Sequence, residues 1–297
     1  MSEAVLHLFE NTHFWTIIGS MAGIVCAIGA IITIIIMVKH GKSPSPHSNL
    51  LLALVESYAK DISTWFSERY KKMQEVARSS DLELDPSNPQ YESAFKHLVE
   101  NIDGFPGGYY LLNEEGTVVH HFTPNFPKVK IVGYNAYERP YFEACHRTLM
   151  PIVSNQILST DRHVNILVAA VPRFDREKNF KGIFDAVIDL PSAPFSEMAL
   201  SAVDHLMKSS SLSTRNANRI LLSLIDEQGF VLGCNNLNRV GLNLQEDPII
   251  KTFLSEKQQS DPAIIWKNVI RGAIVSVKGT PFIAVAYVIS TSRHRGA

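Results

Sequence analysis

The sequence predicts an α+β protein in which a membrane helix and a long helix precede two copies of one antiparallel-sheet unit. Three observations predict this architecture: an uncharged apolar stretch, a helical repeat of apolar residues, and an internal duplication. The predicted segments are a tail at residues 1–13, a transmembrane helix at 14–38, a long helix at 44–82, a first sheet unit at 83–190 and a second at 191–297.

Composition argues against several classes of protein. The 297 residues carry a net charge of -1 and 19% charged residues, so we expect no nucleic-acid-binding surface. The three cysteines, Cys26, Cys145 and Cys234, form no C-x-x-C pair, which argues against a disulfide framework and a zinc site. Nucleophile-elbow, H-E-x-x-H and P-loop patterns do not occur in the sequence. We therefore expect no enzyme activity, no metal and no cofactor.

Residues 14–38 contain no Asp, Glu, Lys or Arg. A helix of this length crosses the ~30 Å hydrocarbon core of a bilayer, whereas a buried soluble helix rarely stays apolar for so long. Because no Lys or Arg precedes the stretch and no small-residue cleavage site follows it, we expect a retained anchor and not a signal peptide. Gly19, Gly23 and Ala27 share one face of this helix, where they either form a homodimer contact or are the small residues common in such helices.

The charges that flank the anchor bear on its orientation. Glu3 and Glu10 precede it, and Lys39 and Lys42 follow it. Positive charge is usually in excess on the cytoplasmic side of membrane helices, so these two lysines favour a cytoplasmic body. The preference rests on only two charges.

A long helix is expected after the Ser/Pro stretch at residues 42–46. Apolar residues recur at steps of three and four between Leu51 and Val76, with lysine and acidic residues between them. At 1.5 Å per residue, a helix over residues 49–79 is ~45 Å long, which is too long for one small unit. We interpret it as a spine for the rest of the chain, and its aromatic stripe as core packing.

The remaining chain is duplicated. A strand–turn–strand pattern around Gly116 recurs around Gly229, and residues 132–140 match residues 240–248 at five of nine positions. Each copy continues into a short helix and two long strands, so each is an α+β unit of ordinary domain size. At four equivalent positions the first copy has a cation and three aromatic residues, whereas the second copy has an acid and three aliphatic residues. The residues are Tyr134, Arg139, Tyr141 and Phe142 in the first copy, and Leu242, Asp247, Ile249 and Ile250 in the second. This difference predicts a binding site in the first copy and a structural role for the second.

Specific motifs in the first copy resemble a known family. Residues 138–142 read Glu-Arg-Pro-Tyr-Phe, and residues 151–154 read Pro-Ile-Val-Ser. With the membrane helix, the spine and the duplication, residues 44–290 resemble the double Cache sensor domains, two tandem PAS-like units, of bacterial chemoreceptors, histidine kinases and diguanylate cyclases.

The resemblance implies a binding site in the membrane-distal first unit and a body outside the cytoplasm, at the inner membrane. In that family the unit binds a small ligand, often an amino acid or another carboxylate. Arg139 would hold the carboxylate in its planar fork. Tyr134 and Tyr141 would supply hydroxyl groups and walls, and Phe142 an apolar contact.

One departure from the family motif concerns the acid that receives the ligand ammonium. The corresponding position is Val187, while Asp185 lies two residues earlier on the same strand face and could replace it. Asn155 is a further candidate for the pocket, with a surface loop as the alternative. The ligand is thus amino-acid-like, a plain carboxylate or an unrelated small solute.

The sequence predicts a single-pass, membrane-anchored sensor that binds a small molecule for signal transduction. We expect no output domain in this chain, and therefore a separate signalling partner. The alternative is a ligand-free structural or interaction module, or a remnant of a diguanylate cyclase, kinase or chemoreceptor.

Overall fold

The computed structural model describes residues 46–79, 82, 89–126, 130–209, 219–247, 250–251, 263–267 and 270–288. The predicted tail and transmembrane helix, residues 1–38, lie outside these ranges. Within the ranges, no helix combines the length and the hydropathy needed to cross a bilayer. The chain divides into two compact units, Met1–Asn49 and Leu50–Ala297, and the description below concerns the second.

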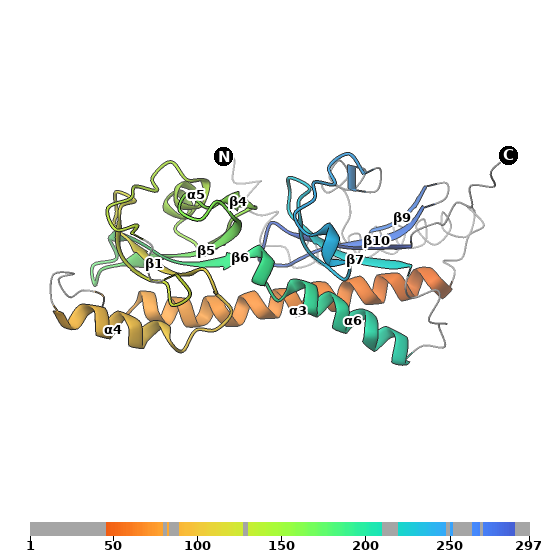
Figure 1. Cartoon of the computed structure of the whole chain (residues 1–297), viewed down its shortest axis with the longest axis horizontal. Coiled ribbons are helices and arrows are strands. Elements are labelled where there is room, and N and C mark those ends of the chain that lie inside the picture. Colours follow the sequence, from red (N-terminus) through yellow and green to blue (C-terminus); the bar gives the residue numbers. More distant parts are fainter. Residues whose placement is uncertain are drawn as a thin grey trace, which may run out of the picture. The chain divides into compact units, whose positions relative to one another are not determined.

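The long predicted helix is confirmed as α3 (Pro46–Ala77), with 32 residues. Its apolar positions, spaced three and four apart, bury one face, which includes Val55, Tyr58, Ile62 and Phe66. The helix runs beneath both sheets (Figure 1). Two side chains of α3 donate hydrogen bonds to carbonyl groups of the second half of the chain. Tyr58 Oη donates to the Phe195 carbonyl at 2.8 Å, and Ser63 Oγ donates to the Lys278 carbonyl at 3.0 Å.

The first sheet is antiparallel, with the strand order β2-β1-β6-β5-β3 and the short β4 paired to β5. Its strands are β1 (Gly108–Leu112), β2 (Val118–Phe122), β3 (Ile152–Val153), β4 (Ile157–Leu158), β5 (Asn165–Phe174) and β6 (Phe180–Asp189). Helix α4 (Pro89–Val99) precedes the sheet, and α5 (Pro140–Thr148) lies between β2 and β3 along the chain.

The second sheet is also antiparallel and has the order β8-β7-β11-β10-β9. Its strands are β7 (Ile220–Ile225), β8 (Val231–Cys234), β9 (Ala263–Lys267), β10 (Ile270–Ser276) and β11 (Ile283–Val288). A 3-10 turn, η2 (Leu190–Ser192), and α6 (Phe195–Ser209) connect the two sheets, and η3 (Leu237–Arg239) follows β8. In both sheets the first strand pairs with the second and the last, so the strand order is the same.

The turns of the two sheets also match. Gly116 donates to the Asn113 carbonyl, and Gly229 to the Asp226 carbonyl, both at 3.0 Å. Both glycines have positive φ, 77° and 87°, and a Cβ on either would lie within 2.8 Å of a backbone nitrogen. Glycine is therefore required at both turns for conformational and steric reasons.

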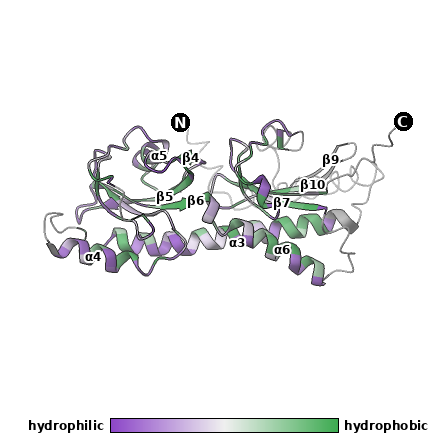
Figure 2. Cartoon of the chain, viewed as in Figure 1, coloured by the Kyte–Doolittle hydropathy of each residue, from purple (hydrophilic) through white to green (hydrophobic). Residues whose placement is uncertain are grey.

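One core cluster joins α3, α4, α6 and the facing side of both sheets. The opposite side of the first sheet packs against α5 in a separate cluster that includes Tyr141, Phe142 and Cys145. Strands β5 and β6 are mostly hydrophobic in Figure 2 and are buried at consecutive positions, because both of their faces are covered. The candidate site lies on the α5 side of this sheet.

Candidate functional site

A small cavity of about 40 Å³ lies on the α5 side of the first sheet. Its walls include aromatic and charged side chains from β1, β6, the connection between β2 and α5, the start of α5 and the loop after β4: Tyr110, Tyr134, Arg139, Tyr141, Arg162 and Asp185. A larger outer hollow of about 630 Å³ is lined by Tyr137, Glu138 and their neighbours. Tyr134 and Arg139 line both hollows. A polar head group therefore fits the inner cavity, and the outer hollow has room for the rest of a ligand.

Asp185 is the buried acid of the inner cavity. It lies on β6, in register with Tyr110 of β1 and Ala170 of β5, and is only 2% exposed. Among the described residues, none donates a hydrogen bond to its Oδ1 atom. Burial raises the pKa of this carboxyl well above its ordinary value. A donor such as an ammonium group would supply the missing hydrogen bond.

Arg139 is the partly exposed cation at the boundary of the two hollows. It is the N-cap residue of α5, with an extended backbone (φ -77°), and Pro140 begins the helix. Its Nη2 atom donates to the Leu158 carbonyl at 2.8 Å, which ties the start of α5 to β4. The guanidinium keeps further donors for an anion, because it has five N–H groups.

Two residues of α5, Tyr141 and Cys145, lie near Asp185 of β6. Burial, and secondarily the Asp185 charge, raises the pKa of the Tyr141 hydroxyl. Burial likewise raises the pKa of the Cys145 thiol to about 12, and the nearby Asp185 carboxyl adds to the shift. The thiol is therefore protonated at neutral pH and is a poor nucleophile.

Four of the six predicted site residues line the cavity together: Tyr134, Arg139, Tyr141 and Asp185. Val187 lines it as well, so Asp185 and Val187 share a strand face, as the two-residue period predicts. Phe142 does not line it; this side chain is fully buried in the core, with ring centroids 5.7 Å from Tyr137 and 5.9 Å from His146.

Asn155 also lies outside the cavity lining. It belongs to the three-residue connection between β3 and β4, where the backbone N–H of Gln156 donates to Asp226 Oδ2 of the second half at 2.9 Å. Asp226 is fully buried, and its Oδ1 atom accepts from the backbone nitrogens of Gln228 and Phe230. Asn155 is therefore next to a contact between the two halves.

Several groups at the cavity have no counterpart in the sequence-based prediction, among them Tyr110, Asp161 and Arg162. Tyr110 faces Asp185 from the neighbouring strand, and strand alternation could have identified it once the pairing register was known. Arg162 comes from the loop after β4; its side chain is only 9% exposed and pairs with Asp189 at 2.7 Å. The sequence around Arg162 contains no periodic pattern that would place this loop residue at the cavity.

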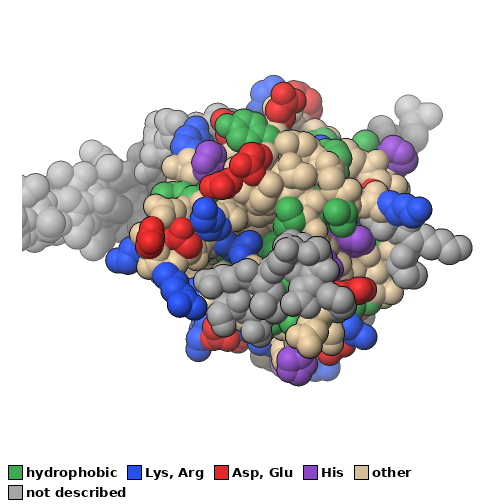
Figure 3. Space-filling model, turned by 90° about the vertical axis from the view of Figure 1, so that its left-hand side faces the viewer, with side chains coloured by type: hydrophobic (Ala, Val, Ile, Leu, Met, Phe, Trp, Pro, Cys, Tyr) green, Lys and Arg blue, Asp and Glu red, His purple; other side chains and the backbone are tan. Residues whose placement is uncertain are grey.

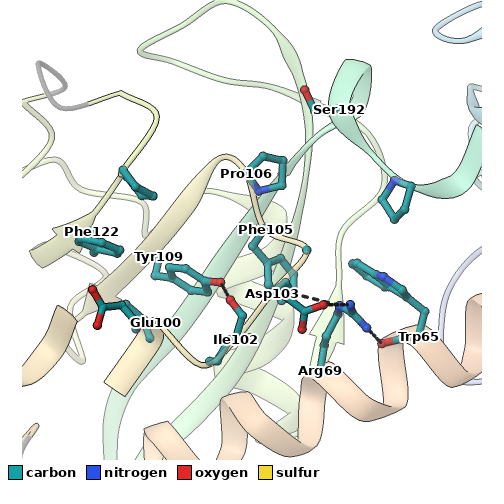
Figure 4. Close-up of a pocket in the computed structure, with 14 residues that line it drawn as sticks. Trp65, Arg69, Glu100, Ile102, Asp103, Phe105, Pro106, Tyr109, Phe122 and Ser192 are labelled. Carbon is teal, nitrogen blue, oxygen red and sulfur yellow. Dashed lines mark hydrogen bonds and ion pairs between the residues drawn. The ribbon is translucent and has the colours of Figure 1, made fainter. Parts of the chain in front are cut away.

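A larger hollow of about 670 Å³ lies on the other side of the first sheet, next to α3 (Figure 4). Its polar groups bind one another. Arg69 contacts the Asp103 carboxylate at 2.6 Å, the Asp103 carbonyl at 3.1 Å and the Trp65 carbonyl at 3.3 Å, and it lies over the Trp65 ring. The Tyr109 hydroxyl donates to the Ile102 carbonyl. This hollow is larger than the inner cavity, but its Arg69 and Asp103 side chains are already paired with each other.

The charged surface gives no support for a polyanion site on the end of the protein in Figure 3, where acidic and basic side chains are intermixed. Among the described residues, no group of three or more His, Cys, Asp or Glu side chains is arranged to hold a metal ion. The inner cavity is therefore the best-supported candidate site in the described part of the chain.

Comparison with known sequences identifies no relative. No protein-family model matches this chain, and no curated protein matches it.

Comparison with solved structures is informative about the fold. An extracellular ligand-binding receptor from Desulfohalobium retbaense matches at 11% identity and a TM-score of 0.59, over 80% of this chain and 39% of that one. The ligand-binding domain of the Pseudomonas aeruginosa amino-acid chemoreceptor PctC, solved with GABA, matches at 16% identity and 0.56, over 82% and 100%. The extracellular domain of a histidine kinase matches at 16% identity and 0.59, over 83% and 96%.

The fold is thus that of the Cache-type extracellular ligand-binding domains found in chemoreceptors and histidine kinases. At these identities the similarity describes the fold alone. Function has to be argued from the cavity.

Proposed function

We propose that this chain is the sensor part of a membrane-anchored receptor and that its first sheet unit binds a small carboxylate or amino-acid-like solute. The two sheets are then tandem PAS-like units, the first of them distal to the membrane. Residues 14–38 are the anchor, with Gly19, Gly23 and Ala27 available for pairing with a second copy. The body lies outside the cytoplasm, as do the extracellular domains that share its fold.

One observation carries this proposal: the inner cavity holds a buried acid without a hydrogen bond on Oδ1, and an arginine stands at its mouth. A solute with an ammonium and a carboxylate satisfies both groups. The ammonium donates to Asp185, and the carboxylate accepts from Arg139. Tyr134 and Tyr141 add aromatic walls, which also attract a cation.

The function is binding and not catalysis. A protonated Cys145 thiol and a lone buried acid do not make a nucleophile with an adjacent base. Binding would instead change the packing on α3, because a single core cluster connects this helix to both sheets. In sequence, α3 begins at Pro46, shortly after the predicted anchor at residues 14–38, so we expect this helix to carry the signal toward the membrane.

Thermal unfolding of the full chain in detergent tests the proposal. The ligands are the common L-amino acids, short mono- and dicarboxylates and short amines, each at millimolar concentration. At least one ligand should raise the melting temperature by a few degrees, since a ligand at a hundred times its Kd adds about 2.7 kcal/mol.

Arg139→Ala should abolish this stabilisation, whereas Arg147→Ala, an exposed position on the same helix, should preserve it. If no compound stabilises the wild type, the result would favour the alternative, a module that has kept the fold without a ligand. The same holds if Arg139→Ala responds as fully as the wild type.

A further inference from the structure

The first half has a loop, residues 159–164, that the second half lacks. In the first sheet it connects β4 to β5, whereas β9 ends at Lys267 and β10 begins at Ile270, with two residues between them. The two sheets otherwise have the same strand order. An added loop at one wall of the cavity is the kind of local difference that creates a specific site on a common frame.

This loop is held in one conformation by its own hydrogen bonds. The Ser159 backbone N–H donates to the Val164 carbonyl at 2.9 Å, and the Ser159 hydroxyl bonds to Asp161. Arg139 holds the residue before the loop, since it donates to the Leu158 carbonyl. In this conformation the loop places Arg162 against the cavity.

The Arg162 guanidinium is paired through Nη1, whereas its Nε atom makes no hydrogen bond with the described residues. Its Nη1 atom lies 2.7 Å from the Asp189 carboxylate, and its guanidinium carbon lies 4.4 Å over the Phe126 ring. Its Nε atom is buried and has no hydrogen bond from the described residues, although Asp161 Oδ2 lies 3.5 Å away. A buried guanidinium donor that lacks a hydrogen bond is costly unless a partner completes it.

We infer that Arg162 is a ligand-binding residue whose Nε–H donates to a carboxylate oxygen of the solute. This inference rests on the proposed function and adds a second guanidinium to it. The carboxylate then lies between Arg139 at the mouth and Arg162 at the inner wall, while Asp185 receives the ammonium. The site consequently prefers free carboxylates over the matching amides.

Isothermal titration of the full chain with four pairs of compounds tests this inference. The pairs are L-alanine, L-leucine, L-asparagine and L-glutamine, each beside its carboxamide. Wild type should bind at least one acid about tenfold or more tighter than its amide, the value of a hydrogen bond to a charged group. Arg162→Lys keeps the ion pair with Asp189 and loses Nε–H. It should bind the acid about tenfold more weakly and lose less affinity for the amide, whose neutral carbonyl accepts a weaker hydrogen bond from Nε–H.

Asp189→Asn is the matched control, because it removes the ion pair and keeps the Arg162 donor. Its preference for the acid should stay within about threefold of wild type, below the tenfold effect of one charged hydrogen bond. The inference is overturned if Arg162→Lys keeps the full preference, or if Asp189→Asn loses as much as Arg162→Lys. Absence of binding by wild type to all eight compounds would instead overturn the amino-acid form of the proposed function itself.

Discussion

The two halves of this chain share a frame and differ in what the frame encloses. The strand registers identify the equivalent residues directly. In the first sheet Tyr110 pairs with Asp185 and Gly108 with Val187, and in the second Ser223 pairs with Val285 and Leu221 with Tyr287. The acid of the first half is therefore a valine in the second, and the small Val187 is a tyrosine. The comparison shows that a few exchanges turn a packed core into a polar cavity.

The second half uses its polar groups internally. The Tyr287 hydroxyl accepts a hydrogen bond from Arg239, whose guanidinium lies 5.6 Å from the tyrosine ring. Val285 is fully buried among other apolar side chains. Where the first half leaves the Oδ1 of a buried acid without a hydrogen bond, the second packs a methyl-bearing side chain. Close packing accounts for the second half, and the proposed ligand would account for the first.

The largest effect should come from exchanging the two central residues. Val285→Asp places an acid in the packed second core and should lower the free energy of unfolding by about 3 kcal/mol or more. Asp185→Val removes a poorly solvated acid from the first half and should leave stability equal or higher, while ligand binding is lost. Urea unfolding monitored by circular dichroism measures both changes.

Val285→Ala is the control for the second half, since it removes methyl groups without adding charge. It should cost less than Val285→Asp. If Asp185→Val destabilises the chain as strongly as Val285→Asp, Asp185 has a structural partner, and the contrast between the halves is wrong.

A smaller effect is expected at the two matching turns. Asp226 accepts three backbone hydrogen bonds, from Gln156, Gln228 and Phe230, whereas Asn113 accepts one, from Thr117. At about 1 kcal/mol for each lost bond, Asp226→Ala should cost about 2–3 kcal/mol and Asn113→Ala about 1 kcal/mol. Chemical denaturation of the full chain gives both values.

Asp226→Asn separates the contact between halves from the turn itself. Asparagine keeps one carbonyl oxygen for the turn and cannot accept from Gln156 through its amide nitrogen. The free energy of unfolding of Asp226→Asn should therefore lie between those of wild type and Asp226→Ala. Equal costs for Asp226→Ala and Asn113→Ala would mean that the two additional bonds of Asp226, from Gln156 and Gln228, add nothing.

Much of the fold could be predicted because its signals are local. The apolar spacing predicted α3, and the period of two placed Asp185 and Val187 on one strand face. The duplication pointed to Tyr134, Arg139 and Tyr141, three residues that line one cavity.

The rest depended on three-dimensional packing. Neighbouring helix positions point about 100° apart, so Tyr141 and Phe142 do not both face one cavity, and only the packing of α5 decides which one does. Asn155 lies next to Gln156, whose backbone contacts Asp226, and the two contacting residues are 70 positions apart in sequence. Arg162 reaches the cavity through a loop conformation that no periodicity encodes.

The smallest effect is the pH dependence that Asp185 adds and Val285 cannot. Burial raises the pKa of the Asp185 carboxyl in the folded state, so the unfolded chain loses this proton at lower pH than the folded chain. The stability that the group contributes is therefore complete below its unfolded pKa, about 3.9, and is lost as the pH rises toward the folded pKa.

Asp185→Asn removes this loss, because the amide does not ionise. Its free energy of unfolding should match that of wild type near pH 4 and exceed it increasingly toward pH 8, measured by urea unfolding at each pH. Asp175→Asn is the opposite control: hydrogen bonds from Asn179 lower the pKa of Asp175, so its loss should reduce stability only above pH 4. A wild-type to Asp185→Asn difference that is constant with pH would mean that Asp185 stays equally charged in both states, and would remove the acid from the contrast between the halves.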